Sequence, residues 1–275
     1  MYDLDNKVAI ITGAGGKNGI GRSVATRLAK EGSKIIVTDI VENPYPEEGW
    51  NGLSSVVEEI IENGGEAVHI LSDVTDFSSI NNLIKEAIKK FGRVDILVNN
   101  AGATADKDRV PIFDLDENEW DKVIDVNLKG VFLFTKAFSK QLILQNQGGK
   151  IINISSIAGK KGSATFGAYN ASKAGVIRLT ESIALDLAKY NINVNSVCPS
   201  WVDTERVDVY VEHLYQDNIS HEEKRKLHLS NIESSVPLGR YASSDDVAKA
   251  VAFLSSEESS FVTGASLNVS GGIIA

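Results

Sequence analysis

Short runs rich in valine and isoleucine recur along this chain, and longer stretches with helical spacing of apolar residues lie between most of them. Near-continuous apolar strands separated by amphipathic helices are typical of parallel strands that are buried on both faces and joined by helical crossovers. The pattern therefore predicts a doubly wound α/β fold, a parallel sheet with helices on both faces. The predicted strands begin near Lys7, Lys34, Glu66, Asp95, Lys150, Ile192 and Ser266.

Two stretches do not follow this alternation. One is residues 41–52, which hold two prolines and two glycines after the second predicted strand. The other spans about residues 205–240 and is polar, mixed in charge and interspersed with aromatic residues. Because a segment that long between regular elements is usually a lid or binding loop, we expect a substrate lid there. We find no linker or internal repeat, so residues 1–275 are predicted to form a single domain.

Composition narrows the possible partners. The chain has 275 residues and a net charge of -9, with no long basic stretch, which argues against nucleic acid as a main partner. No apolar run approaches the roughly 20 residues needed to cross a bilayer, so no membrane association is expected. The single cysteine, Cys198, cannot form an internal disulfide, and the N-terminal sequence does not resemble a secretory signal. We therefore predict a cytoplasmic protein.

A glycine-rich stretch, TGAGGKNGIG at residues 12–21, directly follows the first predicted strand. Glycines allow an anion to approach the backbone, and the N-terminus of the helix expected from about Gly19 to Gly32 favours negative charge. The second strand ends in Asp39, whose carboxylate can bind the ribose hydroxyls of adenosine and repel the 2'-phosphate of NADP. The pattern favours NAD, although Lys17 and Asn18 in the glycine-rich stretch keep NADP as an alternative.

Candidate catalytic residues lie further along the chain. Tyr169 and Lys173 are four apart in a predicted helix and share a face. Because a free tyrosine has a pKa of about 10, a neighbouring ammonium is needed to bring it into the range of general acid/base catalysis. Ser156 ends a predicted strand, which places its hydroxyl at the carboxyl edge of the sheet, where open α/β folds bind ligands.

With these motifs in order, the sequence resembles the classical short-chain dehydrogenase/reductase family over nearly its whole length. The motifs are TG and GIG in the glycine-rich stretch, Asp73-Val74, NNAG at residues 99–102, DVNLKG around Asn127, NISS at residues 153–156, YNASK from Tyr169, and VNSVCPS followed by VDT to Thr204. The resemblance implies a Rossmann-type domain. The sequence departs from the family pattern at two places. Gly13 and Gly19 enclose five residues instead of three, and Trp201 follows a Pro-Ser pair where the family usually has Pro-Gly.

The resemblance also implies roles for the catalytic residues. Tyr169 would be the general acid/base that exchanges a proton with the substrate oxygen while hydride moves to or from the nicotinamide. Lys173 would lower the pKa of Tyr169 and bind the nicotinamide ribose. Ser156 would hold the substrate oxygen, and Asn127 would anchor a water that links Lys173 to solvent.

For the cofactor, the resemblance places Asp73 and Val74 at the adenine. It places Asn100, Ala101 and Gly102 near the adenosine ribose, and Val202 and Thr204 at the carboxamide. The full implied set is Gly13, Gly19, Ile20, Gly21, Asp39, Asp73, Val74, Asn100, Ala101, Gly102, Tyr169, Lys173, Pro199, Val202 and Thr204. The expanded glycine loop is expected to add a bulge that lies close to residues 41–52. Trp201 either narrows the substrate pocket or covers the core.

The leading prediction is an NAD-dependent oxidoreductase that interconverts a secondary alcohol and a ketone. The alternatives are an NADP-dependent carbonyl reductase of the 3-oxoacyl type and a nucleotide-binding sensor without catalysis. The resemblance further implies a homo-oligomer, commonly a tetramer. The substrate pocket is expected to be lined by Phe166, Trp201, Tyr210 and Tyr215.

Other reactive side chains are given no catalytic role. We predict no metal site, because the spacing of His213, His221 and His228 matches no compact ligand motif. Solvated surface positions or substrate contacts are expected for these histidines. Cys198 is predicted to be a small buried hydrophobic residue.

Overall fold

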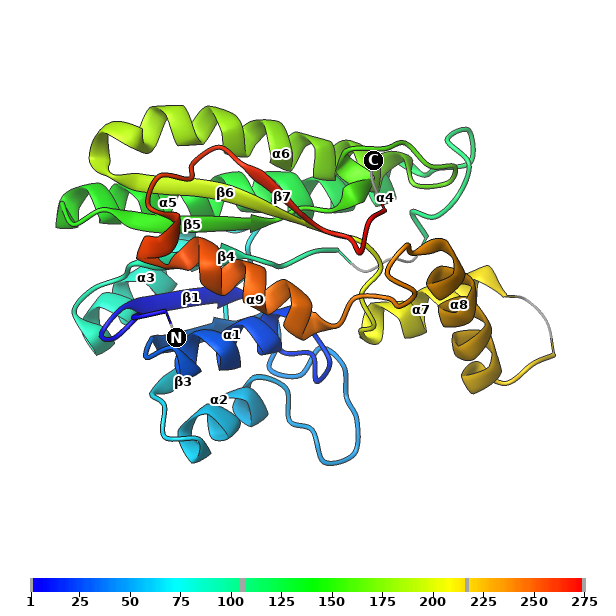
Figure 1. The fold of residues 1–275 in the computed structure, drawn as a ribbon, viewed down its shortest axis with the longest axis horizontal. Coiled ribbons are helices and arrows are strands. Elements are labelled where there is room, and N and C mark those ends of the chain that lie inside the picture. The colour runs from blue at the N-terminus through cyan, green and yellow to red at the C-terminus, as the bar shows by residue number, and fades with distance from the viewer. Residues whose placement is uncertain (1, 104–106, 216–217, 274–275) are drawn as a thin grey trace.

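The computed structural model describes residues 2–103, 107–215 and 218–273. Seven parallel strands form one sheet in the order β3-β2-β1-β4-β5-β6-β7 (Figure 1). This confirms the predicted parallel sheet, and each predicted strand is present. The strands are β1 Val8–Thr12, β2 Lys34–Thr38, β3 Ala67–His69, β4 Ile96–Asn99, β5 Gly149–Ile154, β6 Ile192–Pro199 and β7 Ser266–Val269.

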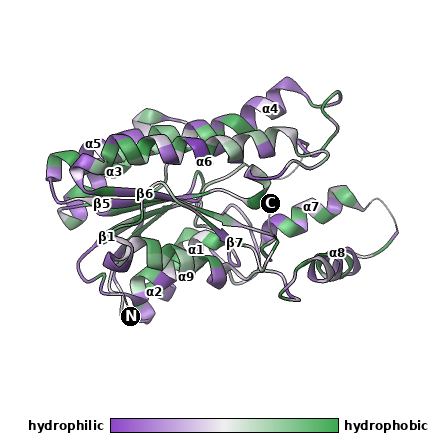
Figure 2. Ribbon diagram, turned by 45° about the horizontal axis from the view of Figure 1, so that its top comes forward, coloured by the Kyte–Doolittle hydropathy of each residue, from purple (hydrophilic) through white to green (hydrophobic). Residues whose placement is uncertain are grey.

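Helices cover both faces of the sheet, with α1, α2 and α9 on one side and α3, α4, α5 and α6 on the other (Figure 2). Their bounds are α1 Ile20–Lys30, α2 Leu53–Glu62, α3 Phe77–Phe91, α4 Glu117–Ile124, α5 Gly130–Gln145, α6 Gly167–Leu187, α7 Glu205–Leu214, α8 His221–Ser235 and α9 Ser244–Ser255. A five-residue π-helix, Asp125–Lys129, joins α4 to α5. Within the described part of the chain, no helix combines the length and apolar character needed to span a membrane.

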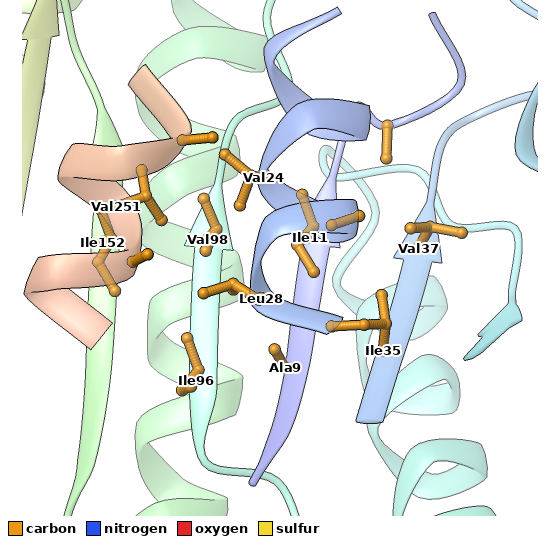
Figure 3. Packing of buried hydrophobic residues seen from close by; sticks show 14 of the residues in the cluster. Ala9, Ile11, Val24, Leu28, Ile35, Val37, Ile96, Val98, Ile152 and Val251 are labelled. Atoms are coloured by element: carbon orange, nitrogen blue, oxygen red, sulfur yellow. The ribbon is translucent and has the colours of Figure 1, made fainter. Parts of the chain in front are cut away.

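The hydrophobic core has two halves, one on each face of the sheet. On β1, Ala9 and Ile11 pack in the cluster that includes α1 and α9, whereas Val8 and Ile10 pack in the cluster that includes α3, α5 and α6. All five β1 residues are buried, which explains why this strand is apolar up to Thr12 rather than alternating. Figure 3 shows the first cluster, with labelled residues Ala9, Ile11, Val24, Leu28, Ile35, Val37, Ile96, Val98, Ile152 and Val251.

The strand order reverses beside β1. This strand pairs with β2 on one side and with β4 on the other, so the chain winds outward in opposite directions from this point. Loops that leave the carboxyl ends of β1 and β4 therefore diverge and leave a crevice between them, the usual ligand site of an open α/β sheet.

The stretch predicted to be a lid contains two helices, α7 and α8, which lie beyond the carboxyl ends of the strands (Figure 1). Ser220 and Glu223 form a reciprocal capping box that starts α8. The buried positions of α8 are Lys224, His228 and Ile232, so two of the three are polar. The hydrophobic pattern therefore did not predict a helix here, and the role of a lid remains a prediction.

Candidate active site

A cavity of about 800 Å³ lies at the carboxyl ends of the strands. The structure brings nearly all of the predicted site residues to its wall, apart from Gly21 and Asn127, which do not line it. The predicted residues that line the cavity are Gly13, Gly19, Ile20, Asp39, Asp73, Val74, Asn100, Ala101, Gly102, Ser156, Tyr169, Lys173, Pro199, Val202 and Thr204.

The turn after β1 requires glycine at two positions. Gly13 has a φ of +65°, and a Cβ on it would lie 2.7 Å from the Cα of Ala101. A Cβ on Gly21 would lie 2.5 Å from the carbonyl oxygen of Gly13, so Gly21 allows α1 to pack directly on the turn. The Asn100 amide donates to the carbonyl oxygens of Thr12 and Gly13, at 2.9 and 2.8 Å. Gly21 and the Asn100 side chain therefore fix the shape of the turn.

The expanded part of the glycine loop packs against residues 41–52. Trp50 Nε1 donates to the carbonyl oxygen of Gly15 at 2.9 Å, and Lys17 forms an ion pair with Glu47 at 2.6 Å. This confirms the expected proximity of the two loops. Lys17 does not line the cavity, because its ammonium is directed to Glu47.

Asp39 lies directly after β2 and lines the cavity. Its carboxylate accepts hydrogen bonds from the N–H groups of Gly15 and Ile40, at 3.1 and 2.9 Å. Burial raises the pKa of Asp39, and these two hydrogen bonds oppose only part of that rise. Asp39 thus connects the end of β2 to the glycine loop, which agrees with its predicted place at the end of the second strand.

The carboxylate of Glu205 accepts a hydrogen bond from the glycine loop just before α1. The N–H of Asn18 donates to Glu205 Oε1 at 2.5 Å, and Glu205 Oε2 lies 3.0 Å from where a Cβ on Gly16 would be. This carboxylate stands in for a phosphate, since both are anions that accept hydrogen bonds from backbone N–H groups. The glycine loop therefore has a backbone donor suited to an anion such as a pyrophosphate, and we expect Glu205, at the first position of α7, to compete with it.

We expect Glu205→Gln to tighten NAD binding by about 3- to 10-fold, because the neutral amide competes less with phosphate at the positive end of the helix. Titration of NAD by calorimetry measures this change. Glu212→Gln, another acid on α7 that does not line the cavity, is the matched control. Unchanged or weaker binding in Glu205→Gln would show that the carboxylate does not oppose the cofactor.

Tyr169 and Lys173 lie one turn apart on α6. Lys173 Nζ donates to the carbonyl oxygen of Ile154 at 2.8 Å and lies 5.7 Å from the centre of the Tyr169 ring. Burial raises the pKa of Tyr169, but the charges of Lys173, Arg206 and Arg109, together with the nearby Ser156 hydroxyl, lower it below its usual value. Burial also lowers the pKa of Lys173. The site thus stabilises the phenolate form of Tyr169.

Hydrogen bonds to neighbouring residues hold the side chains of Ser156 and Asn127 in place. Ser156 begins a short turn after β5, and its hydroxyl accepts the Ala158 N–H at 3.1 Å. Asn127 lies in the π-helix and is 1% exposed. Its side chain accepts the Ala103 N–H at 2.8 Å and donates to the Ser172 hydroxyl at 3.1 Å, which ties the π-helix to α6. The proposed water-anchoring role of Asn127 remains a prediction.

Comparison with known proteins identifies the family. The family model described as enoyl-(acyl carrier protein) reductase matches residues 13–274. The chain is 37% identical to the 3-oxoacyl-[acyl-carrier-protein] reductase of Synechocystis sp., over 100% of this chain and 99% of that protein. It is 38% identical to galactitol 2-dehydrogenase of Agrobacterium fabrum, over 98% of each. The chain belongs to the short-chain dehydrogenase/reductase family.

The structure of NAD⁺-bound xylitol dehydrogenase agrees, with a TM-score of 0.84 and 34% identity over 98% of this chain and 99% of that one. This short-chain dehydrogenase/reductase is thus an oxidoreductase that uses a nicotinamide cofactor. The glycine turn, the Asn18 N–H that binds a carboxylate and Asp39 are the features of its own structure that fit such a cofactor.

Two arginines in the cavity of this short-chain dehydrogenase/reductase were not predicted from the sequence. The guanidinium carbon of Arg109 lies 4.4 Å from the centre of the Tyr169 ring, and that of Arg206 lies 5.9 Å from it. Arg109 belongs to the segment between β4 and α4, and Arg206 to α7. Neither position carries a periodic pattern or a motif, so no sequence signal could have found them.

The outer wall of the cavity is aromatic. Phe166, Trp201 and Tyr210 line it, and their ring centres lie 5.5 to 6.5 Å apart. Trp201 therefore lines the pocket, and it also packs on His228 of α8, with ring centres 5.0 Å apart. Tyr215 was wrongly predicted to line the pocket. It ends α7 and faces His228 instead.

His228 departs from the predicted placement of the histidines, whereas the exposed His221 agrees with it. His228 is 6% exposed and packs among aromatic rings, so it is neither solvated nor part of the cavity wall. His221 is exposed and pairs with Glu212 at 2.5 Å. The His213 side chain lies outside the described part of the structure. Among the side chains that the structure describes, no three potential metal ligands of the His, Cys, Asp and Glu types gather.

Cys198 is fully buried at the end of β6, as predicted. Burial raises the pKa of its thiol, which disfavours the reactive thiolate.

Proposed function

We propose that this enzyme is an NAD-dependent dehydrogenase that interconverts a secondary alcohol and a ketone. The observation that carries the proposal is the lowered pKa of Tyr169 beside the Ser156 hydroxyl, at the wall of a cavity that also contains Asp39 and the glycine turn. A cytoplasmic location remains a prediction from the sequence.

The chain's own residues would handle the oxygen and the proton. Tyr169 takes the proton from the alcohol during oxidation and returns it during reduction, and the nearby positive charges make the phenolate accessible. Ser156 donates a hydrogen bond to the same substrate oxygen, where negative charge develops. The carbonyl oxygen of Ile154, at the end of β5, accepts a hydrogen bond from Lys173 and so holds the ammonium near Tyr169. When bound, the nicotinamide cofactor supplies hydride transfer.

NAD is favoured over NADP by the electrostatics at the end of β2. The Asp39 carboxylate lies where adenosine hydroxyls are expected, and Lys17, the cation that could have bound a 2'-phosphate, is paired with Glu47 outside the cavity. The similar xylitol dehydrogenase carries NAD⁺. An NADP-dependent carbonyl reductase is the second candidate, because a 3-oxoacyl reductase is among the similar proteins.

We expect Asp39→Ala to lower the preference for NAD over NADP by about 10- to 100-fold in kcat/KM, since hydrogen bonds to a charged group and a like-charge repulsion are both lost. Initial rates with the two cofactors measure the ratio. Lys17→Ala should leave the ratio unchanged, and a loss of NADP use in that variant would instead assign Lys17 to the 2'-phosphate.

A screen of secondary alcohols with NAD, and of ketones with NADH, at the absorbance of the reduced cofactor tests the function itself. Turnover of at least one pair supports a dehydrogenase. Cofactor binding without turnover of any alcohol or ketone would favour a nucleotide-binding sensor without catalysis.

We further propose a homo-oligomer, such as a tetramer, because exposed apolar side chains lie on α5 and α6, with Leu144 79% and Leu185 81% exposed. Nucleic acid and membrane are not proposed as partners.

A further inference from the structure

Arg109 is a buried cation, and two of its three guanidinium nitrogens make no hydrogen bond among the described residues. Its side chain is 7% exposed, and it lines the cavity beside Tyr169. Among the residues that the structure describes, neither Nε nor Nη1 of Arg109 has a hydrogen-bond partner. Buried donors that remain unsatisfied are costly, and a charged one more so, which indicates that a ligand completes this site.

The surroundings of Arg109 place it on the substrate side of the cavity. The guanidinium stacks on Phe166, with its carbon 4.1 Å from the ring centre, and Phe166 in turn contacts Trp201 and Tyr210. These rings form the aromatic wall of the cavity, and Phe166 also contacts the ring of Tyr169, with ring centres 6.2 Å apart. A hydrogen-bond acceptor that binds Arg109 would therefore belong to the substrate, whose reacting oxygen contacts Tyr169.

The charge near Tyr169 is predominantly positive. Arg109, Arg206 and Lys173 all act on its pKa, and each lowers it. Asp108 Oδ2 lies 3.3 Å from Nη1 of Arg109 and forms an ion pair that offsets part of this charge, although neither Nη1 nor Nε makes a hydrogen bond among the described residues. Because Asp108 already balances part of the charge of Arg109, a single negative charge is enough to pair with the guanidinium. The planar guanidinium fork matches a carboxylate.

We propose that Arg109 binds a carboxylate of the substrate, so that the enzyme acts on a short hydroxy acid and the corresponding oxo acid. The inference rests on the proposed function, because it names the substrate class of the same site. Since Arg109 stacks on the ring of Tyr169, the carboxylate lies only a few bonds from the carbon that is oxidised or reduced. In the reducing direction the ketone gains a hydride from NADH and a proton from Tyr169, and becomes the hydroxy acid.

The test compares oxo acids with their methyl esters, which have nearly the same shape but no charge. The probes are pyruvate, acetoacetate and levulinate, which vary the distance between ketone and carboxylate, each beside its methyl ester and with NADH. We expect kcat/KM for the best acid to exceed that of its ester by about 100-fold or more, because the ester leaves the cation unpaired. Equal rates for acid and ester in the wild-type enzyme would overturn the proposal.

Arg109→Gln is expected to reduce kcat/KM for the acid by about 30- to 100-fold more than for the ester. The comparison of acid with ester is necessary because removal of Arg109 also raises the pKa of Tyr169, which affects both substrates equally. Lys161→Gln, at an exposed lysine on the rim of the cavity, is the matched control and should leave the ratio unchanged. An acid preference that persists in Arg109→Gln would also overturn the proposal.

A binding measurement separates this proposal from the proposed function. Lactate, 3-hydroxybutyrate and 4-hydroxyvalerate, each with its methyl ester, are titrated by calorimetry into the complex with NADH, where no oxidation occurs. Tighter binding of an acid, lost in Arg109→Gln, supports the carboxylate site even if no ketone in the panel is reduced. Absence of any difference between acid and ester overturns it, even if neutral ketones are good substrates and the dehydrogenase function stands.

Discussion

Tyr169→Phe is expected to lower kcat for alcohol oxidation by about 10³-fold or more, while the affinity for NAD stays within a few-fold of the wild type. The variant loses only the hydroxyl that exchanges the proton with the substrate. The ring remains, so its contacts with Phe166 and with Arg109 are preserved. Steady-state rates with the best alcohol from the screen, together with calorimetric titration of NAD, measure the two quantities.

Tyr190→Phe provides the matched control, since it removes the hydroxyl of a tyrosine in the turn that directly follows α6, away from the cavity. Its turnover should equal that of the wild type. If Tyr169→Phe retained turnover within about 10-fold of the wild type, the proton would have to travel by another route, which is outside the 10²- to 10⁴-fold contribution typical of general acid/base catalysis. The assigned mechanism would then be wrong.

The sheet could be predicted from the sequence because its central strands, such as β1 and β4, are buried on both faces. β1 is apolar up to its last residue, Thr12, and short polar or glycine-containing segments separate the strands from amphipathic helices. The lid helices gave no such signal. The buried positions of α8 include Lys224 and His228, whose burial depends on contacts with α7 and with the aromatic wall, and local periodicity carries no information about those contacts.

The same distinction applies to the site. Ser156, Tyr169 and Lys173 were found because the chemistry requires these residue types at fixed positions on a strand end and a helix face. Arg109 was missed because its position depends on how the segment after β4 folds over Tyr169. The contact of the Glu205 carboxylate with the glycine loop was not predicted for the same reason, since 187 positions along the chain separate Glu205 from its partner Asn18. Long-range contacts between irregular segments are thus the part that sequence patterns did not predict.

Lys173→Met is expected to reduce alcohol oxidation near neutral pH by about 10²-fold, and to move the pH dependence to higher pH. Oxidation requires the phenolate of Tyr169, so kcat/KM rises with pH until that group is deprotonated. The charge of Lys173 is the largest of the effects that lower the pKa of Tyr169, and without it the phenolate forms only at higher pH. Ketone reduction requires the neutral phenol, so the variant should keep this activity to higher pH than the wild type.

Profiles of kcat/KM against pH in both directions check this expectation. A uniform loss at every pH, with an unchanged midpoint, would mean that Lys173 serves only to position the cofactor or the helix. The variant also removes the donor to the Ile154 carbonyl, so thermal unfolding should be recorded to verify that it folds. Lys173→Arg keeps the positive charge, and its midpoint should stay nearer to that of the wild type even if the larger side chain lowers the rate. A midpoint that moved equally in both variants would rule out the charge as the cause.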